Sequence, residues 1–407
     1  MQYNCAMQNR LHFTPEAPLG YQSSIAELVL TQNNEILPET ESRNNWILET
    51  GEEPENSKLS IIVPIHNEQK HLPSFLSALM FLDIPQGVQA DFYLVNNASN
   101  DLSYDILFDF LENLANTNKL ELDIHEIPQE LLRAALIWDC EINIGYKIQI
   151  GTISFNLINT TTPGKANALN IGLAMAQYKK HEYCVTIDAN NYPESDSIRK
   201  IYAATKTFED NEVVVGSAVP KTAITNNRSF VEKQLYKHFR ADKKGNLKEF
   251  LKYKVNGWMM VFDTNWVLKN GGVVNCAIED YATGLLAEIK NKRIKHIINT
   301  GIWGFRTTSP KDRAKECERF VRGRLRILAM FEKEYPEIRE LMQKDNYIMR
   351  APKERIVYLA NEVKNNPKRF PIIFANWIVQ EYSKIQGEKE YKRNPRNSSW
   401  EAINSTK

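Results

Sequence analysis

Alternation of short apolar runs with amphipathic stretches is the feature that most constrains how this chain can fold. The run LSIIVPI (59–65) is rich in β-branched residues and has a proline near its end, which is typical of a buried parallel strand. HLPSFLSALMFL (71–82) then has helical spacing, ADFYLVNN (90–97) resembles a second strand, and DLSYDILFDFLENLAN (101–116) a second amphipathic helix. Because parallel strands need crossover connections, this alternation predicts a mostly parallel α/β sheet flanked by helices.

The same pattern continues along the chain, with one irregular segment. KLELDIHEI (119–127) alternates like a third strand, whereas residues 128–160 mix the helix-like ELLRAALIW with the β-like YKIQIGTISFNLI and are treated as an insertion. A long charged helix is expected over residues 228–255. The other expected elements are helices at 165–180 and 278–292 and strands at 181–189, 212–220, 256–264 and 293–299.

Three parts are expected from these patterns. Residues 1–57 are polar and acidic, contain four prolines and have weak periodicity, so they predict an N-terminal extension. Residues 58–310 hold the strand–helix alternation of an α/β domain. Residues 311–407 are almost wholly helical in pattern, which predicts a C-terminal helical subdomain that ends in a frayed tail.

Charge and cysteine content narrow the functional class. The chain has 51 Lys and Arg against 50 Asp and Glu, a net charge of +1, which argues against a nucleic-acid partner. Five scattered cysteines without a CxxC pair argue against zinc ribbons and disulfide frameworks and predict a reducing compartment. No leader-like segment and no apolar run of about 18 residues is seen, so we expect a cytoplasmic protein, with peripheral membrane contact left open.

A carboxylate follows one of the predicted strands at its carboxyl end. Asp188 ends TID and is followed by ANNYP, and ligands of α/β sheets are commonly bound at such a position. The oxygens of Asp188 and Asn190 are the kind that Mg²⁺ or Mn²⁺ prefers. The other interpretation is a plain turn in which both side chains stabilise the backbone.

A glycine and a lysine open the predicted helix at 165–180. The N–H groups and the dipole of a helix N-terminus favour anions, and Lys165 adds a positive charge suited to phosphate. The other interpretation is an ordinary helix start with a solvated lysine. At a second strand tip, VNNASND, Asn97 and Asp101 are placed to bind a base and a ribose, although Asp101 suits an N-cap equally well.

Acidic, basic and aromatic residues in the second half of the sequence each allow two interpretations, one functional and one structural. Glu279 and Asp280 start a predicted helix, where a carboxylate acts either as a general base or as a partner of the helix dipole. Trp258, like Trp303, is either an acceptor platform or core. Three arginines at helical spacing indicate either phosphate recognition or a solvated face, such as one that lies on an anionic membrane: Arg319, Arg322 and Arg326.

The order and spacing of these motifs are more specific than any one of them. VPIHNE, VNNASND, GKANALN, TIDANNYP, NGWMMVFDTNWVLKNGG and IED follow one another as in family 2 glycosyltransferases, which the chain resembles over about residues 58–310. The resemblance implies a GT-A fold, a mostly parallel, Rossmann-like sheet. In that fold a nucleotide-sugar binds across the carboxyl ends of the first strands. It also implies a divalent metal, Mg²⁺ or Mn²⁺, and an inverting mechanism.

The resemblance further implies a role for each matching residue. Two departures matter: Asn190 stands where a second aspartate is usual, and Asn97 replaces an acid that contacts the base. The processive QxxRW motif is absent. The implied roles are donor binding by Pro64, His66, Glu68, Asn97, Asp101, Lys165, Asp188 and Arg322, metal binding by Asp188 and Asn190, acceptor binding by Trp258 and Glu279, and catalysis by Asp280.

The expected reaction moves a sugar from a nucleoside-diphosphate-sugar to a hydroxyl of a carbohydrate, lipid-linked or small-molecule acceptor. The metal and Lys165 would stabilise the leaving diphosphate, and Asp280 would accept the proton of the hydroxyl. Two other functions remain open. One is a degenerate module that binds nucleotide-sugar or glycan without turnover, which Asn97 and Asn190 suggest. The other is a sugar nucleotidyltransferase, although its glycine-rich loop is missing after the first strand.

Overall fold

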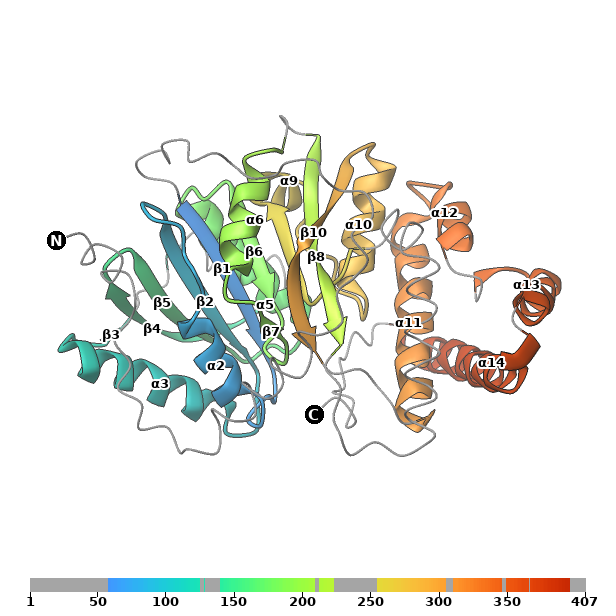
Figure 1. The fold of residues 1–407 in the computed structure, drawn as a ribbon, viewed down its shortest axis with the longest axis horizontal. Helices are drawn as coiled ribbons and strands as arrows, with labels where there is room; N and C mark the ends of the chain where they lie inside the picture. The colour runs from blue at the N-terminus through green and yellow to red at the C-terminus, as the bar shows by residue number, and fades with distance from the viewer. Residues whose placement is uncertain are drawn as a thin grey trace.

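One large sheet organises the part of the chain that the computed structural model describes, which is residues 58–124, 128, 140–208, 212–222, 255–304, 310–345, 349–365 and 367–395. The strands are β1 (Lys58–Ile65), β2 (Gln89–Asn97), β3 (Asp123–Ile124), β4 (Ile142–Ile150), β5 (Ile153–Thr160), β6 (Tyr183–Ile187), β7 (Tyr192–Pro193), β8 (Val213–Thr222), β9 (Met259–Asp263) and β10 (Arg293–Gly304). Their order across the sheet is β3-β4-β5-β2-β1-β6-β9-β8-β10-β7 (Figure 1).

The centre of the sheet is parallel, with one reversed strand. β5, β2, β1 and β6 pair in parallel, as do β8 and β10. β9 runs antiparallel to both of its neighbours, β6 and β8. Because β9 is reversed, its first residue lies at the same edge of the sheet as the last residue of β6, and Met259 is paired with Ile187.

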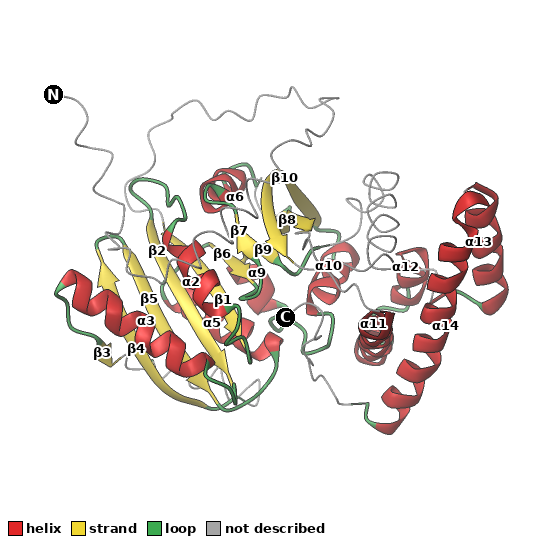
Figure 2. Ribbon diagram, turned by 60° about the horizontal axis from the view of Figure 1, so that its bottom comes forward, coloured by secondary structure: helices red, strands yellow, loops and turns green. Residues whose placement is uncertain are grey.

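Helices cover both faces of this sheet (Figure 2). Alternate residues of β1 enter different cores: Ile61 and Val63 pack in one, and Ile62 in the other, as the two-residue period of a strand requires. The first core includes residues of α2 (Leu72–Met80), α3 (Ser103–Asn118) and α6 (Ser197–Thr205), and the second includes α5 (Lys165–Tyr178), α9 (Thr264–Lys269) and the end of α10 (Glu279–Ile289).

Helix α5 is the most deeply buried of the helices on the second face. Its residues from Ala166 to Ala176 are all buried, so the helix is apolar or small on nearly every side. It lies against β1 closely enough that a Cβ on Gly172 would come within 2.5 Å of Cγ2 of Ile62. This close contact fixes the height of the α5 N-terminus, and with it Lys165, above the sheet.

The C-terminal part is helical, as predicted. It consists of α11 (Pro310–Phe331), α12 (Ile338–Asp345), α13 (Pro352–Asn365), a short 3₁₀ turn η2 (Pro367–Arg369) and α14 (Phe370–Arg393). A third core joins α10 to α11 and α12 through residues such as Ile278, Ile327 and Met342. Among the described residues, no helix combines the length and apolar character that a bilayer crossing requires.

The predicted fold class is therefore confirmed, but the prediction of the third strand was wrong. Of residues 119–127, only Asp123 and Ile124 are in a strand, β3, and it pairs antiparallel at the sheet edge. The parallel neighbour of β2 is β5, which comes from the segment treated as an insertion; Gly151, with φ of 59°, lies in its hairpin with β4. The predicted extension 1–57, helix-like segment 130–138, most of the helix 228–255 and the end of the tail lie outside the described residues.

We expect Gly172→Ala to lower the free energy of unfolding by about 1–3 kcal/mol, although alanine favours helices, because the new methyl group overlaps Ile62. Urea denaturation measures this loss. Ile62→Ala alone should also destabilise, by about 2–5 kcal/mol. The double variant should be more stable than the sum of both losses implies, because the added methyl group partly fills the space left by Ile62; strict additivity would contradict the contact.

Candidate functional site

The predicted site motifs meet at the edge of the sheet where β6 ends and β9 begins. Asp188 follows β6 directly, and its backbone N–H donates to the carbonyl oxygen of Trp258 over 3.0 Å, immediately before β9. Lys165 opens α5 and Glu279 opens α10, so their side chains reach this edge from two helix N-termini. The pairing of β6 with β9 therefore brings together segments that lie about seventy to eighty positions apart in the sequence.

Lys165 is the centre of the cluster. Its ammonium lies 2.7 Å from Oδ1 of Asp188 and 2.7 Å from Oε1 of Glu279, and it donates to the carbonyl oxygen of Gly257 over 3.3 Å. The side chains of Lys165 and Asp188 are each 12% exposed and that of Glu279 is 6% exposed. This is a nearly buried ion-pair network in which one cation is shared by two carboxylates.

Asp280 is held by two backbone groups beside this network. Its Oδ2 accepts from the N–H of Gly257 over 2.9 Å, and its Oδ1 accepts from the N–H of Tyr281 over 2.8 Å. A Cβ on Gly257 would lie 2.8 Å from Oδ2 of Asp280, so only glycine allows the backbone this close to the carboxylate. Gly257 therefore contacts both Lys165 and Asp280 and fixes their relative positions.

The electrostatics of the cluster follow from burial and from the shared cation. Burial is the largest effect on Asp188 and raises its pKa to about 6, although Lys165 opposes the rise. Burial, followed by the charge of Glu279, likewise raises the pKa of Asp280. For Lys165, burial disfavours the ammonium, but Asp188, Glu279 and Asp280 together outweigh burial and raise its pKa.

A residue that the sequence analysis did not single out positions the loop before Glu279. Asn170 on α5 donates from Nδ2 to the carbonyl oxygen of Val273 over 3.0 Å and accepts at Oδ1 from the N–H of Val273 over 2.6 Å. Asn170 is buried, so this paired contact joins α5 firmly to the loop that leads into α10. The available signal was a polar side chain within the predicted helix, in the run GKANALN, which also holds Lys165 and Asn167.

The loop after β1 contacts the loop after β6. Glu68 is buried, and its Oε1 accepts from Nδ2 of Asn190 over 3.2 Å. His71, three residues on, lies 3.2 Å from the hydroxyl of Tyr192 through its Nδ1. The structure therefore brings Glu68 next to Asn190, a pair that the sequence analysis had assigned separately to donor and to metal.

The tips of β1 and β2 are joined in the same way. Nδ1 of His66 lies 2.6 Å from the backbone oxygen of Asn97, and Pro64 lies within β1, paired with Val95 of β2. The side-chain oxygen of Asn97 is buried and makes no hydrogen bond to the described residues. The predicted donor residues Pro64, His66 and Asn97 are therefore adjacent at one strand tip.

Asp101 lies one residue before the N-cap of α3, which is Leu102, so it contacts the start of the helix without being the predicted N-cap itself. Its Oδ1 accepts from the N–H of Ser103, the first residue of α3, over 2.9 Å, and its Oδ2 accepts from the N–H of Gln69 over 3.2 Å. The carboxylate thus stabilises the start of the helix and the loop after β1 together. A role in ribose binding remains a prediction.

The two tryptophans border the loop after β6. Trp258 is half-buried and packs against the first core, and Trp303 on β10 pairs with Tyr192 of β7. A Cβ on Gly304 would lie 2.9 Å from Cζ3 of Trp258, so this glycine makes room for the indole ring. Both rings are held by their surroundings rather than fully exposed.

The predicted arginines lie on α11, which packs against α10 in the third core. Arg322 is half-buried on α11, and its Nε is buried without a hydrogen-bond partner among the described residues. Arg326 lies near enough to Cys276 to affect its pKa, which burial raises to about 12. A contact of Arg322 with phosphate remains a prediction.

Whether the cluster fits a divalent cation can be judged from its donor set. The described residues contain no group of three or more His, Cys, Asp or Glu side chains arranged to hold a metal ion. Asp188 and Asn190 offer a carboxylate and an amide oxygen, since Asn190 uses its nitrogen toward Glu68. Mg²⁺ is commonly bound by one or two carboxylates together with substrate phosphates, so these residues fit a cation that a diphosphate completes.

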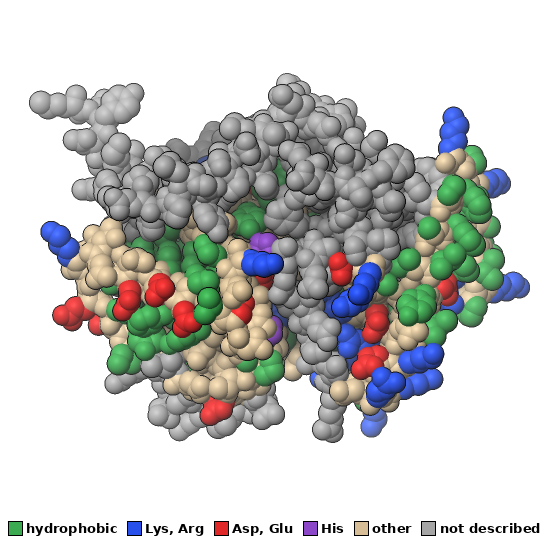
Figure 3. All heavy atoms as spheres, turned by 90° about the horizontal axis from the view of Figure 1, so that it is seen from below, with side chains coloured by type: hydrophobic (Ala, Val, Ile, Leu, Met, Phe, Trp, Pro, Cys, Tyr) green, Lys and Arg blue, Asp and Glu red, His purple; other side chains and the backbone are tan. Residues whose placement is uncertain are grey.

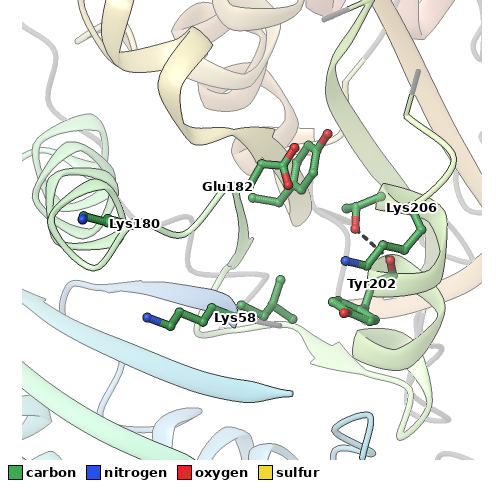
Figure 4. A pocket seen from close by; sticks show the side chains of 8 residues that line it. Lys58, Lys180, Glu182, Tyr202 and Lys206 are labelled. Carbon is green, nitrogen blue, oxygen red and sulfur yellow. Dashed lines mark hydrogen bonds between the residues drawn. The ribbon is translucent and has the colours of Figure 1, made fainter. Parts of the chain in front are cut away.

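A cavity of about 330 Å³ lies elsewhere, at the amino ends of β1 and β6 (Figure 4). Lys58 and Tyr183, which begin these strands, line it together with Lys180, Glu182 and Tyr202. Because the predicted site residues lie at the opposite ends of the same strands, this cavity is separate from the cluster around Lys165.

No protein-family model matches the chain, and no curated protein matches it. Among solved structures it is similar to the mannosyltransferase PcManGT from Pyrobaculum calidifontis in complex with GDP-Man and Mn²⁺. The identity is 14% and the TM-score 0.44, over 87% of this chain and 81% of that chain. It is also similar to S. aureus TarS 1-349 in complex with UDP. The identity is 14% and the TM-score 0.40, over 86% of this chain and 95% of that chain. Likenesses this remote transfer no activity to the present chain.

We expect Lys165→Met to lower the free energy of unfolding by about 3–5 kcal/mol near neutral pH, because it leaves Asp188 and Glu279 buried without their cation. The loss should shrink as the pH falls from neutral toward about 6, because Asp188 has a pKa of about 6 in the native protein and a higher one without the lysine, so its carboxyl becomes neutral in both folded proteins. Protonation then removes a buried charge in the folded state.

Urea denaturation of both proteins at neutral and at mildly acidic pH measures this difference. Asp188→Asn in the Lys165→Met background is the matched control and should recover part of the stability at neutral pH. An equal loss at both pH values would show that packing, not charge, explains the effect.

Proposed function

We propose that this chain is an inverting, metal-assisted glycosyltransferase of family 2, which moves a sugar from a nucleoside-diphosphate-sugar to an acceptor hydroxyl. One observation carries the proposal: Lys165, Asp188, Glu279 and Asp280 meet at a single edge of a mostly parallel sheet. A cation and three carboxylates at this edge are the groups that phosphate departure and hydroxyl deprotonation need.

The donor would lie across the tips of β1, β2 and β6. His66 and Asn97 are adjacent at the first two tips, and Glu68 connects them to Asn190. The diphosphate would approach the N-terminus of α5, where Lys165 supplies positive charge and the helix dipole favours an anion.

The cation, when bound by Asp188 and Asn190, would neutralise charge on the leaving diphosphate. The cluster holds three carboxylates and one ammonium, so without a metal its charge is negative. The positive charge of the cation would offset this and allow an anionic substrate to bind. The amide of Asn190 is a neutral ligand, and the affinity for metal is therefore expected to be modest.

Asp280 would act as the general base. Its carboxylate is oriented by the N–H groups of Gly257 and Tyr281, and burial raises its pKa, which makes it a stronger proton acceptor than an exposed aspartate. The proton of the acceptor hydroxyl would pass to Asp280 while the oxygen forms the new bond to the anomeric carbon. The nucleoside diphosphate would leave from the opposite face with the electron pair of the broken bond, and the configuration would invert.

Residues next to the base would shape the acceptor site. Trp258 precedes β9 beside Gly257, and Glu279 precedes Asp280 while pairing with Lys165. We propose that the acceptor, a carbohydrate, a lipid-linked sugar or a small molecule, binds over Trp258.

Asp280→Asn should reduce sugar transfer by about 10²–10⁴-fold with little change in donor affinity, because the amide keeps the shape of the side chain but accepts no proton. Release of nucleoside diphosphate from a panel of nucleotide-sugars, with a mixture of acceptors, measures transfer, and calorimetry measures donor binding. Asp263→Asn is the matched control, since Asp263 caps α9 at the other end of β9 and should leave transfer unchanged. Turnover at the native rate in the Asp280 variant would rule out its role as base, and donor binding without transfer in the native chain would favour the binding module.

A nucleotide-sugar near 100 times its dissociation constant should stabilise the folded chain by about 2.7 kcal/mol, and more so with Mn²⁺ present. A thermal-shift screen with and without Mn²⁺ measures this gain. Asp188→Ala should lose the Mn²⁺-dependent part, whereas Asp83→Ala, which breaks only an exposed ion pair with Arg199, should keep it. A Mn²⁺ effect that survives in the Asp188 variant would place the metal elsewhere.

A further inference from the structure

Helix α14 carries a row of exposed apolar side chains along one face. Phe370, Phe374, Ile378, Tyr382 and Ile385 follow each other at intervals of four, four, four and three residues, which places them on one side of a helix. Each is between 40 and 57% exposed. We call these five residues the α14 stripe.

The opposite face of α14 already has its packing partner. Ile373, Ser383 and Gly387 are buried there, and a Cβ on Gly387 would lie 2.9 Å from Cβ of Val321 on α11. The α14 stripe is therefore a second apolar face, which the packing among the described residues does not use. An apolar face left open in this way commonly marks an interaction surface.

Helix α13 packs beside α14 (Figure 2) and has an exposed face of mixed character. Ile356 is 60% exposed and Val357 is 53% exposed. Helical spacing places Lys353 and Lys364 on the same face as these two aliphatic residues. Apolar and basic groups therefore share one surface here.

Basic charge is concentrated in this part of the chain. Residues 349–395 contain ten Lys and Arg against five Asp and Glu, a net charge of +5, whereas the whole chain carries +1. The face of the α14 stripe continues at its carboxyl end into Lys389 and Lys392. Figure 3 shows apolar side chains gathered over the C-terminal helices on the right, with Lys and Arg around them.

We propose that the α14 stripe and the exposed face of α13 dock the protein on the surface of an anionic lipid bilayer. The aromatic and aliphatic side chains would enter the region between headgroups and acyl chains, and the lysines would contact anionic headgroups. Phe370, Phe374 and Trp377 stack in sequence along α14, and such rings suit the membrane interface.

Charge favours a lipid surface over a second copy of the chain. A two-fold interface would bring together two copies of this segment, each with a net charge of +5, and this repulsion costs free energy. A bilayer with anionic headgroups meets both the apolar and the basic requirement. This proposal does not rest on the proposed transferase activity.

Vesicle flotation of the full chain tests the proposal. We expect flotation with vesicles of phosphatidylcholine and phosphatidylglycerol, and at least tenfold weaker binding to phosphatidylcholine alone. Phe374→Ser with Ile378→Ser should weaken binding to the anionic vesicles by roughly tenfold or more, and so should Lys389→Gln with Lys392→Gln. Phe81→Ser, at a 72% exposed site after α2, is the matched control and should bind as the native chain does.

Far-ultraviolet circular dichroism and thermal unfolding establish that each variant is folded, so a loss of flotation reports on docking. The proposal is overturned if the native chain does not float with anionic vesicles at low salt, or if both double variants float as well as the native chain. It is also overturned if light scattering shows that the native chain is a dimer and that the variant with both Phe374→Ser and Ile378→Ser is a monomer. A second copy of the chain would then cover the α14 stripe.

Discussion

The ammonium of Lys165, shared between Asp188 and Glu279, is the interaction on which the rest of the site depends. Each of the three groups is costly to bury alone, and together they offset most of that cost. They come from the start of α5, the end of β6 and the start of α10, so the network forms only when both helices are seated on the sheet. At this edge, the site is therefore assembled by the same packing of helices on the sheet that stabilises the fold.

Much of the central sheet was predictable because strands buried on both faces are continuous apolar runs. β1, β2, β6 and β9 were all found in this way, and so were the polar residues that follow them, including Asp188. The third strand was missed because residues 119–127 alternate as regularly as a real strand, whereas β5 was hidden in a hairpin next to a helix-like segment. Local alternation does not indicate which of two candidate runs pairs with β2.

The residues that hold the site in place were harder to predict than those that form it. Lys165, Asp188 and Asp280 have the chemistry of a site and were singled out for that reason. Asn170 and Gly257 act through backbone contacts with segments 103 and 23 positions away, and no local pattern reports a contact of that range. Likewise, the hydrogen bond between Asn190 and Glu68 spans 122 positions and became visible only in three dimensions.

The reversal of β9 has a consequence for how such a chain can diversify. β9 is bonded on both sides, to β6 and to β8, so its register is fixed by these ladders rather than by the length of the chain that precedes it. The connection between β8 and β9 can therefore grow or shrink during evolution at small entropic cost while Gly257 stays beside Asp280. Insertions or deletions in that connection would therefore leave the contacts between the two ladders and α10 undisturbed from one descendant to the next.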